Sequence, residues 1–178
     1  MKPAALWQFL PQFNDGYQAP STYVPVYSRC LTAVWRRIRN LGLAGIAPTS
    51  IVLRKVAWSR EFAQGQLSLP GVIVSPEGSE SMPLGSGTNL RDDIGYAVLV
   101  TILTADNEQI AGSLKSPLEW RETIARAFSQ QPLPDVEEVI RCTVEPRAVV
   151  GPDAYQRGLL QSSLVLRFVS RERRGQFY

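Results

Sequence analysis

The chemistry open to this chain is limited by its composition, because none of its 178 residues is a histidine. That absence removes an imidazole general base, a Ser-His-Asp triad and imidazole metal ligands. The glycine cluster "GSGTNL" lacks the lysine of a phosphate-binding loop. Carboxylates are therefore the remaining candidates for catalysis or metal binding.

Four carboxylates lie in or beside a long loop, residues 76–93, which is rich in glycine, serine and proline: Glu77, Glu80, Asp92 and Asp93. Adjacent aspartates on a strand point to opposite faces, so Asp92 and Asp93 cannot form one metal site alone. Together with Glu77 and Glu80 they could assemble an oxygen-ligand site. A simpler explanation is that these charges keep the loop solvated and discourage unwanted pairing at the start of the next strand. We expect no enzyme, no cofactor and no metal, and take these four as candidate subunit or partner contacts.

Composition predicts one folded domain. The chain is 44% hydrophobic and 20% charged, with a net charge of +3, well short of a strongly basic nucleic-acid binder. Arginines cluster in two places, at residues 36–39 and 171–174, and a solvated surface explains them better than a DNA contact does. Cys30 and Cys142 match no metal or redox spacing, so we expect buried free thiols rather than a disulfide.

The first 27 residues interleave aromatic side chains, Trp7 and Phe9 among them, with four prolines. Proline at this density blocks a long helix or a central strand, and aromatics at this density are costly to leave in water. We expect an extended arm lying against its own domain or a neighbouring subunit, with Trp7 and Phe9 as candidate contacts. A short helix around residues 4–10 is an equally good interpretation.

Residues 28–178 are predicted to form a single α+β domain. One helix is expected from Ser28, as N-cap, to a stop at Gly42. A second follows the capping box of Ser116 and Glu119, with Arg121 placed mostly outside its apolar face. Five stretches are typical of strands: "TSIVLRKVAW", "LPGVIVSPE", "IGYAVLVTILT", "EEVIRCTVEP" and "SSLVLRFVSRE". This order predicts a mostly antiparallel sheet of four to five strands flanked by two main helices on one face.

The strand that begins at Ile94 raises a question, because it is apolar on both faces. Two amphipathic helices can cover only one face of the sheet. We therefore expect another copy of the protein to meet the second face or the strand edges. No stretch is long and apolar enough to predict a membrane helix, so we expect a soluble intracellular product or a particle component.

The segments "LPGVIVSPE", "DDIGYAVLVTILTADNE", "PLEWRETIARAF" and "CTVEP…SLVLRFVSRERRG" occur in this order. In this succession the sequence resembles the small neck proteins of tailed bacteriophages, in particular the tail terminators, also called tail-completion or head-tail joining proteins. The resemblance covers roughly residues 50–174 and includes no catalytic signature. The N-terminal arm lies outside it.

This resemblance implies a virion protein that assembles as a homo-oligomeric ring, commonly a hexamer. Such a ring caps the tail tube and joins the tail to the head-side connector. It leaves an axial channel for the transiting DNA and has no membrane partner. Arg141 and Arg167 become candidates for lumen-facing or inter-subunit charges. Two alternatives are another neck component, such as a head-closure stopper or adaptor, and a prophage DNA-binding or regulatory protein.

Overall fold

In a computed structural model of the chain, the described residues are 24–56, 68–78, 81, 91–105, 115–151 and 158–173. In chain order the elements are α1 (Val26–Asn40), a 3₁₀ turn η2 (Pro48–Ser50), β1 (Ile51–Leu53), β2 (Gly71–Pro76), β3 (Arg91–Ala105), α4 (Lys115–Phe128), β4 (Val139–Pro146) and β5 (Leu159–Arg173). The predicted succession of helices and strands is confirmed.

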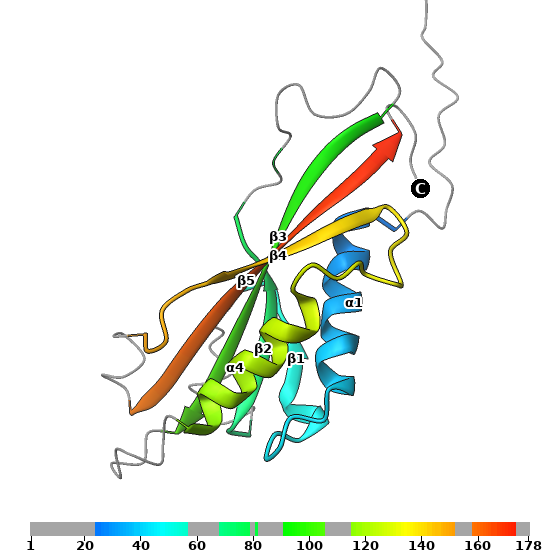
Figure 1. Ribbon diagram of the computed structural model, residues 1–178. Helices are drawn as coiled ribbons and strands as arrows, with labels where there is room; N and C mark the ends of the chain where they lie inside the picture. The colour runs from blue at the N-terminus through cyan, green and yellow to red at the C-terminus, as the bar shows by residue number, and fades with distance from the viewer. Residues whose placement is uncertain are drawn as a thin grey trace, which may run out of the picture.

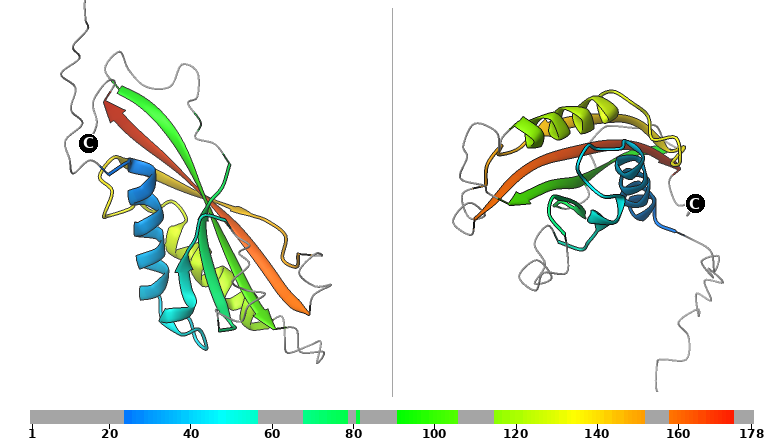
Figure 2. Two further views of the ribbon diagram at one scale, coloured as in Figure 1. Left: turned by 180° about the vertical axis from the view of Figure 1, so that it is seen from behind. Right: turned by 90° about the horizontal axis from the view of Figure 1, so that it is seen from below.

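The five strands form one sheet in the order β1-β2-β3-β5-β4. Its centre is a long ribbon in which β3 and β5 pair antiparallel from Arg91 opposite Arg173 to Ala105 opposite Leu159. This ribbon is strongly twisted (Figures 1 and 2). The predicted α+β class is confirmed, and the sheet is mixed rather than wholly antiparallel because β1 pairs parallel to β2.

Both helices pack on the same face of the sheet. α1 lies against β1 and β2, and α4 against β3, β4 and β5 (Figure 1). A single hydrophobic cluster joins buried side chains of both helices, such as Ile38 and Ile124, to strand residues such as Val74, Val100 and Leu166. Cys30 and Cys142 are buried in this cluster as free thiols, which confirms the cysteine prediction.

The second face of the sheet has two different halves. At one half Ile73, Leu103 and Val165 are fully buried within a single chain. These residues need no partner copy to remove them from water, so that part of the sequence argument for an oligomer is wrong. At the other half Arg167 and Arg171 are exposed. On this face of the sheet, the exposed half that could meet a partner therefore carries charged side chains.

The helix starts differ from the predicted ones. α1 begins at Val26 rather than after Ser28, and Pro25 occupies its N-cap position without a side-chain cap. Tyr27, assigned to the arm from sequence, lies in the helix, and its ring stacks on that of Tyr96 with the ring centroids 5.1 Å apart. α4 begins at Lys115, so Ser116 lies within the helix and not before it. The predicted stop is confirmed, since Gly42 directly follows the C-cap Leu41 with a φ of +62°.

Candidate interaction site

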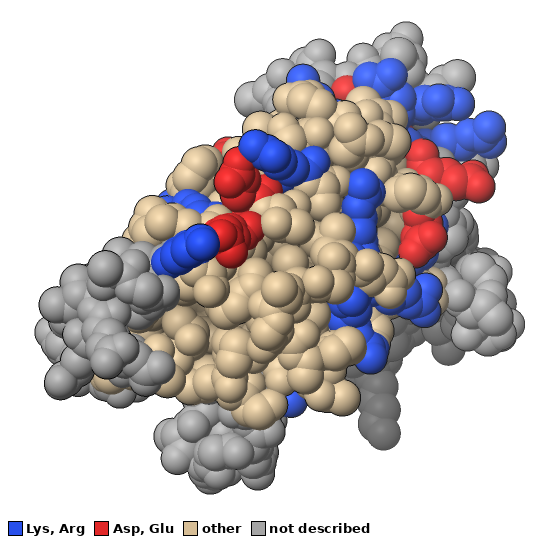
Figure 3. Space-filling view, turned by 60° about the horizontal axis from the view of Figure 1, so that its bottom comes forward, with Lys and Arg blue, Asp and Glu red and all other residues tan. Residues whose placement is uncertain are grey.

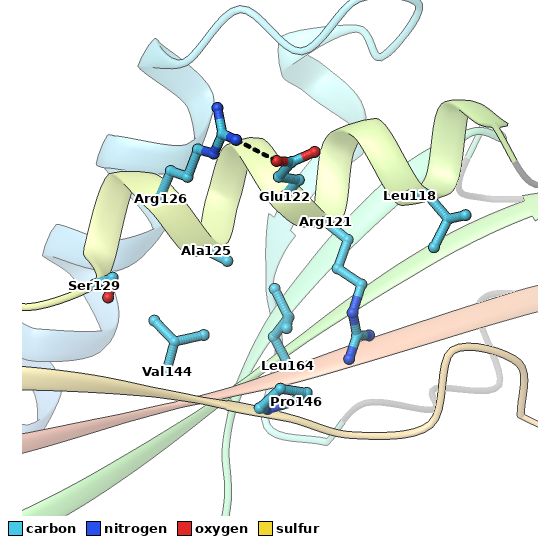
Figure 4. A pocket seen from close by; sticks show the side chains of 9 residues that line it. All are labelled: Leu118, Arg121, Glu122, Ala125, Arg126, Ser129, Val144, Pro146 and Leu164. Atoms are coloured by element: carbon cyan, nitrogen blue, oxygen red, sulfur yellow. Dashed lines mark ion pairs between the residues drawn. The ribbon is translucent and has the colours of Figure 1, made fainter.

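A groove with a volume of about 540 Å³ lies between α4 and strand β4. Its floor and walls include Val144, Pro146 and Leu164 from the sheet, and Leu118 and Ala125 from the helix. Leu118 is 43% exposed although it is apolar. Figure 4 shows these side chains converging on the space between α4 and the strands. The groove thus offers apolar surface to a partner.

Arg121 is the one buried charge in this groove. Its guanidinium reaches from α4 toward the sheet (Figure 4), and the residue is 9% exposed. Nη1 donates to Ser162 Oγ at 2.8 Å and to the Ser163 carbonyl at 2.6 Å, while Nη2 donates to the Arg147 carbonyl at 2.8 Å. All three acceptors are neutral. No carboxylate pairs with Arg121 among the described residues.

The electrostatic surroundings of Arg121 differ from those of Arg167 and Arg171. Burial lowers the pKa of Arg121 below the usual arginine value. By contrast, a hydrogen-bonded carboxylate raises the pKa of Arg167 through Glu145 and that of Arg171 through Asp93. A cation that is desolvated without an anion is costly to maintain. The groove therefore favours a negatively charged group beside Arg121.

Beside the groove, β4 forms one edge of the sheet, because β5 is its only strand neighbour in the described topology. A register shift between Val139 and Arg141 interrupts the pairing, and Ile140 is 49% exposed there. On the outer side of β4 the Cys142 carbonyl accepts a hydrogen bond from the Gln130 N–H at 3.1 Å. Within the described part of the chain, the other backbone groups of this edge can pair with another chain. Groove and edge are thus adjoining parts of one surface.

The second face of the sheet, called here the helix-free face because neither α1 nor α4 packs on it, carries several ion pairs near β4. Arg167 Nε donates to Glu145 Oε1 at 2.6 Å, and Arg171 donates from two nitrogens to Asp93 at 2.7 and 2.9 Å. Arg147 Nη2 donates to Glu77 Oε1 at 2.8 Å. The Arg171 hydrogen bonds hold the pKa of Asp93 below its usual value. These ion pairs are largely exposed, so each contributes little to the free energy of unfolding. Their main effect is on the distribution of charge over this face.

The structure brings together only some of the residues selected from sequence. Arg141 is exposed on β4, opposite Val169, and Thr143 is opposite Arg167. Both arginines therefore lie on the helix-free face, two positions apart on paired strands. Glu77 and Asp93 are separately paired with Arg147 and Arg171, and do not form a common site.

The remaining selected residues are placed as follows. Asp92 lies opposite Glu172 in the register of β3 and β5, and as the neighbour of Asp93 on a strand it points to the opposite face of the sheet. No group of three potential metal ligands occurs in the described segments. Trp7, Phe9 and Glu80 lie outside the described residues.

Arg121 is the functional candidate that the sequence reasoning placed wrongly, on the outer side of its helix. A signal was present, because Arg121 follows Pro117 by four residues and precedes Ile124 and Phe128 by three and seven. All three are buried, and this spacing defines one helix face. A long arginine side chain can lie on an apolar face when its end finds carbonyl acceptors.

The arginines of α1 form a separate basic surface. Arg39 lies over the Trp35 ring at 4.7 Å, and Arg37 lies over Phe128 at 5.1 Å while donating to the Pro132 carbonyl. Arg36 is exposed between them. On the face shown in Figure 3 the charged side chains border a broad uncharged area instead of forming one continuous charged field.

Comparison with known proteins gave no match: neither a family model nor a curated protein matches this chain. Among the described helices, none is long and apolar enough to cross a membrane.

Proposed function

We propose that this protein is a structural subunit of a phage neck. It assembles as a homo-oligomeric ring, expected to be a hexamer, that caps the tail tube and joins the tail to the head-side connector. The proposal rests on the sequence resemblance to tail terminators, and the α+β fold is consistent with it. On this account the protein is a component of the virion and works through interfaces, not catalysis.

The structural observation that supports self-association is the edge of β4 beside the α4 groove, where β5 is the only strand neighbour of β4 in the described topology. In the described topology the sheet ends in β1 on one side and β4 on the other, so it can contact two different copies through two different surfaces. Such head-to-tail contacts close into a ring when the rotation between copies allows it. The exposed Arg141 and the Arg167–Glu145 pair then lie at or near the copy-to-copy boundary or the channel wall.

Incubation with purified tail tubes tests the position in the neck. Electron micrographs of tube ends are expected to show a ring-shaped cap at one end, and tubes that no longer elongate when tube protein is added. Bare ends at saturating protein would contradict the proposal. Caps found on the connector of filled heads instead would favour a stopper or adaptor.

A DNA-binding role is the second candidate, and the basic surface of α1 is the observation that favours it. Arg36, Arg37 and Arg39 lie within one helical turn and a half. A DNA binder of this kind would show affinity that falls steeply with salt concentration. The ring account expects little binding of duplex DNA at physiological salt, so a titration of labelled duplex at two salt concentrations separates the two roles.

A further inference from the structure

The inference concerns what fills the groove between α4 and β4. The guanidinium of Arg121 has five N–H donors, and three of them are used by Ser162, Ser163 and Arg147. The other two have no acceptor among the described residues. These two donors are the Nε–H and one N–H of Nη2. Neither nitrogen of Arg121 is one of the fully buried atoms that lack a hydrogen-bond partner. The unused donors are thus open to a ligand in the groove.

The chemistry of the groove selects an anion held between apolar groups. A carboxylate can accept two parallel hydrogen bonds from a guanidinium, which is the strongest pairing available to arginine. Glu122 and Arg126 also line the groove, but they form an ion pair with each other. The apolar lining residues Leu118, Ala125 and Val144 suit apolar or aromatic side chains on either side of that carboxylate. The adjoining free edge of β4 suits an extended backbone.

One segment of this chain has this pattern. In the N-terminal arm, Asp15 is the only acidic residue among residues 1–27, and Phe13 and Tyr17 stand two positions before and after it. Side chains at alternate positions of an extended segment point to the same side. Phe13, Asp15 and Tyr17 would therefore face the groove together, with the carboxylate between two aromatic rings.

We propose that residues 13–17 of the arm of a second copy bind in the groove between α4 and β4, with the Asp15 carboxylate on Arg121. The second copy is chosen because the groove adjoins the β4 edge at which the proposed ring joins its subunits, so this inference rests on the proposed self-association. An arm of this kind links each subunit to the next. It also supplies the anion that Arg121 lacks within the described part of its own chain.

Photochemical cross-linking of the full-length protein tests the inference. A photoreactive benzoylphenylalanine replaces Phe13 in unlabelled protein, which is mixed with ¹⁵N-labelled protein lacking the probe. Illumination is expected to attach the probe to labelled peptides from residues 115–129 or 139–147. Cross-links to other segments of the labelled chain would overturn the inference. So would cross-links found only within the unlabelled chain that carries the probe, because they would show an arm bound to its own subunit.

A matched control exchanges the two neighbouring side chains in the double variant Asn14→Asp/Asp15→Asn. This variant keeps composition and net charge but moves the carboxylate to the opposite side of an extended segment. The cross-linking yield is expected to fall at least fivefold, and an unchanged yield would overturn the inference. Ala125→Leu, which narrows the groove without removing a hydrogen bond of Arg121, is expected to lower the yield as well.

The mass of each sample is measured before illumination, so that the two proposals fail separately. A closed assembly whose cross-links avoid α4 and β4 removes the groove inference and leaves the ring intact. A monomer with no inter-chain cross-links removes both.

Discussion

Arg121 in α4 and Ser163 in β5 are joined by a hydrogen bond of 2.6 Å, from guanidinium Nη1 to the backbone carbonyl oxygen. A second bond from the same guanidinium reaches the carbonyl of Arg147, which follows β4. One side chain therefore fixes the helix to β5 and to the segment that directly follows the edge strand β4.

Replacing Arg121 by glutamine is expected to lower the free energy of unfolding by about 1–3 kcal/mol, because buried carbonyl groups lose a charged donor. Arg126→Gln on the same helix is the control. Arg126 is exposed and pairs only with Glu122, so its loss should cost about 0.5 kcal/mol or less. Urea unfolding of both variants measures the difference. Equal effects would show that the Arg121 contacts do not stabilise the domain.

The ion pair between Arg29 and Glu138 should make stability depend on pH. Burial raises the pKa of Glu138, but the Arg29 hydrogen bond at 2.6 Å and its charge outweigh this, and the pKa lies below its ordinary value of 4.5. A carboxyl whose pKa is depressed by folding contributes stability that is present above the unfolded pKa and lost as pH falls through the folded one. The contribution should therefore be constant at neutral pH and decline below about pH 4.5.

Glu138→Gln tests this dependence, because it removes the titrating group and nearly preserves shape. The difference in unfolding free energy between wild type and variant should be largest near pH 7 and shrink at pH 3. A difference that stays the same at both values would contradict the role assigned to the pair.

The two thiols should be unreactive in the folded protein. Burial raises the pKa of Cys30 and of Cys142 to about 12, so only about one thiol in 10⁴ is ionised at pH 8. Labelling with a thiol reagent should proceed only after unfolding in urea, and then at both positions. Rapid labelling of either cysteine in native protein would contradict the burial of this part of the core.

The fold was largely predictable from sequence, and the exceptions have physical causes. Period-two alternation and helical spacing depend on burial, so they indicated the central strands and both helices. They could not predict that β3 extends through Asp92 and Asp93, because these polar residues are held in the sheet by pairing with β5 and by the Arg171–Asp93 ion pair. Such contacts join residues far apart in sequence and leave no local pattern.

The candidate site was less predictable than the fold. Arg141 and Arg167 were selected as strand charges, and they do lie together on the helix-free face. Arg121 was assigned to the helix exterior because arginine is usually exposed. Its burial depends on the carbonyls of Ser163 and Arg147, and no sequence pattern shows where backbone acceptors will be available.

Gly95 gives a test of close packing on β3. Ser81 bridges to it through two backbone hydrogen bonds, and a Cβ atom at position 95 would come within 2.3 Å of Ser81 Oγ. Gly95→Ala is expected to cost about 1–3 kcal/mol through overpacking. Adding Ser81→Ala removes the clashing oxygen, so the double variant should recover most of the loss in a double-mutant cycle. Additive effects would contradict the contact.

Charge reversal at the β4 edge tests which surface joins the copies. Arg141→Glu is expected to weaken self-association, because Arg141 is exposed on the free edge strand. Arg167→Glu should act in the same direction, since it also breaks the pair with Glu145. Arg91→Glu is the control, because Arg91 is an exposed arginine that lies on β3, opposite Arg173 of β5, and not on the edge strand β4. Unchanged assembly in the Arg167 variant would remove that residue from the interface.

The central claim is that copies of this chain close into a ring, and the molar mass in solution tests it most directly. Light scattering behind a sizing column should give one closed assembly, near six subunits of 19.8 kDa, whose mass stays constant over a wide range of protein concentration. A mass of one subunit at every concentration, including the highest that remains soluble, would contradict the claim.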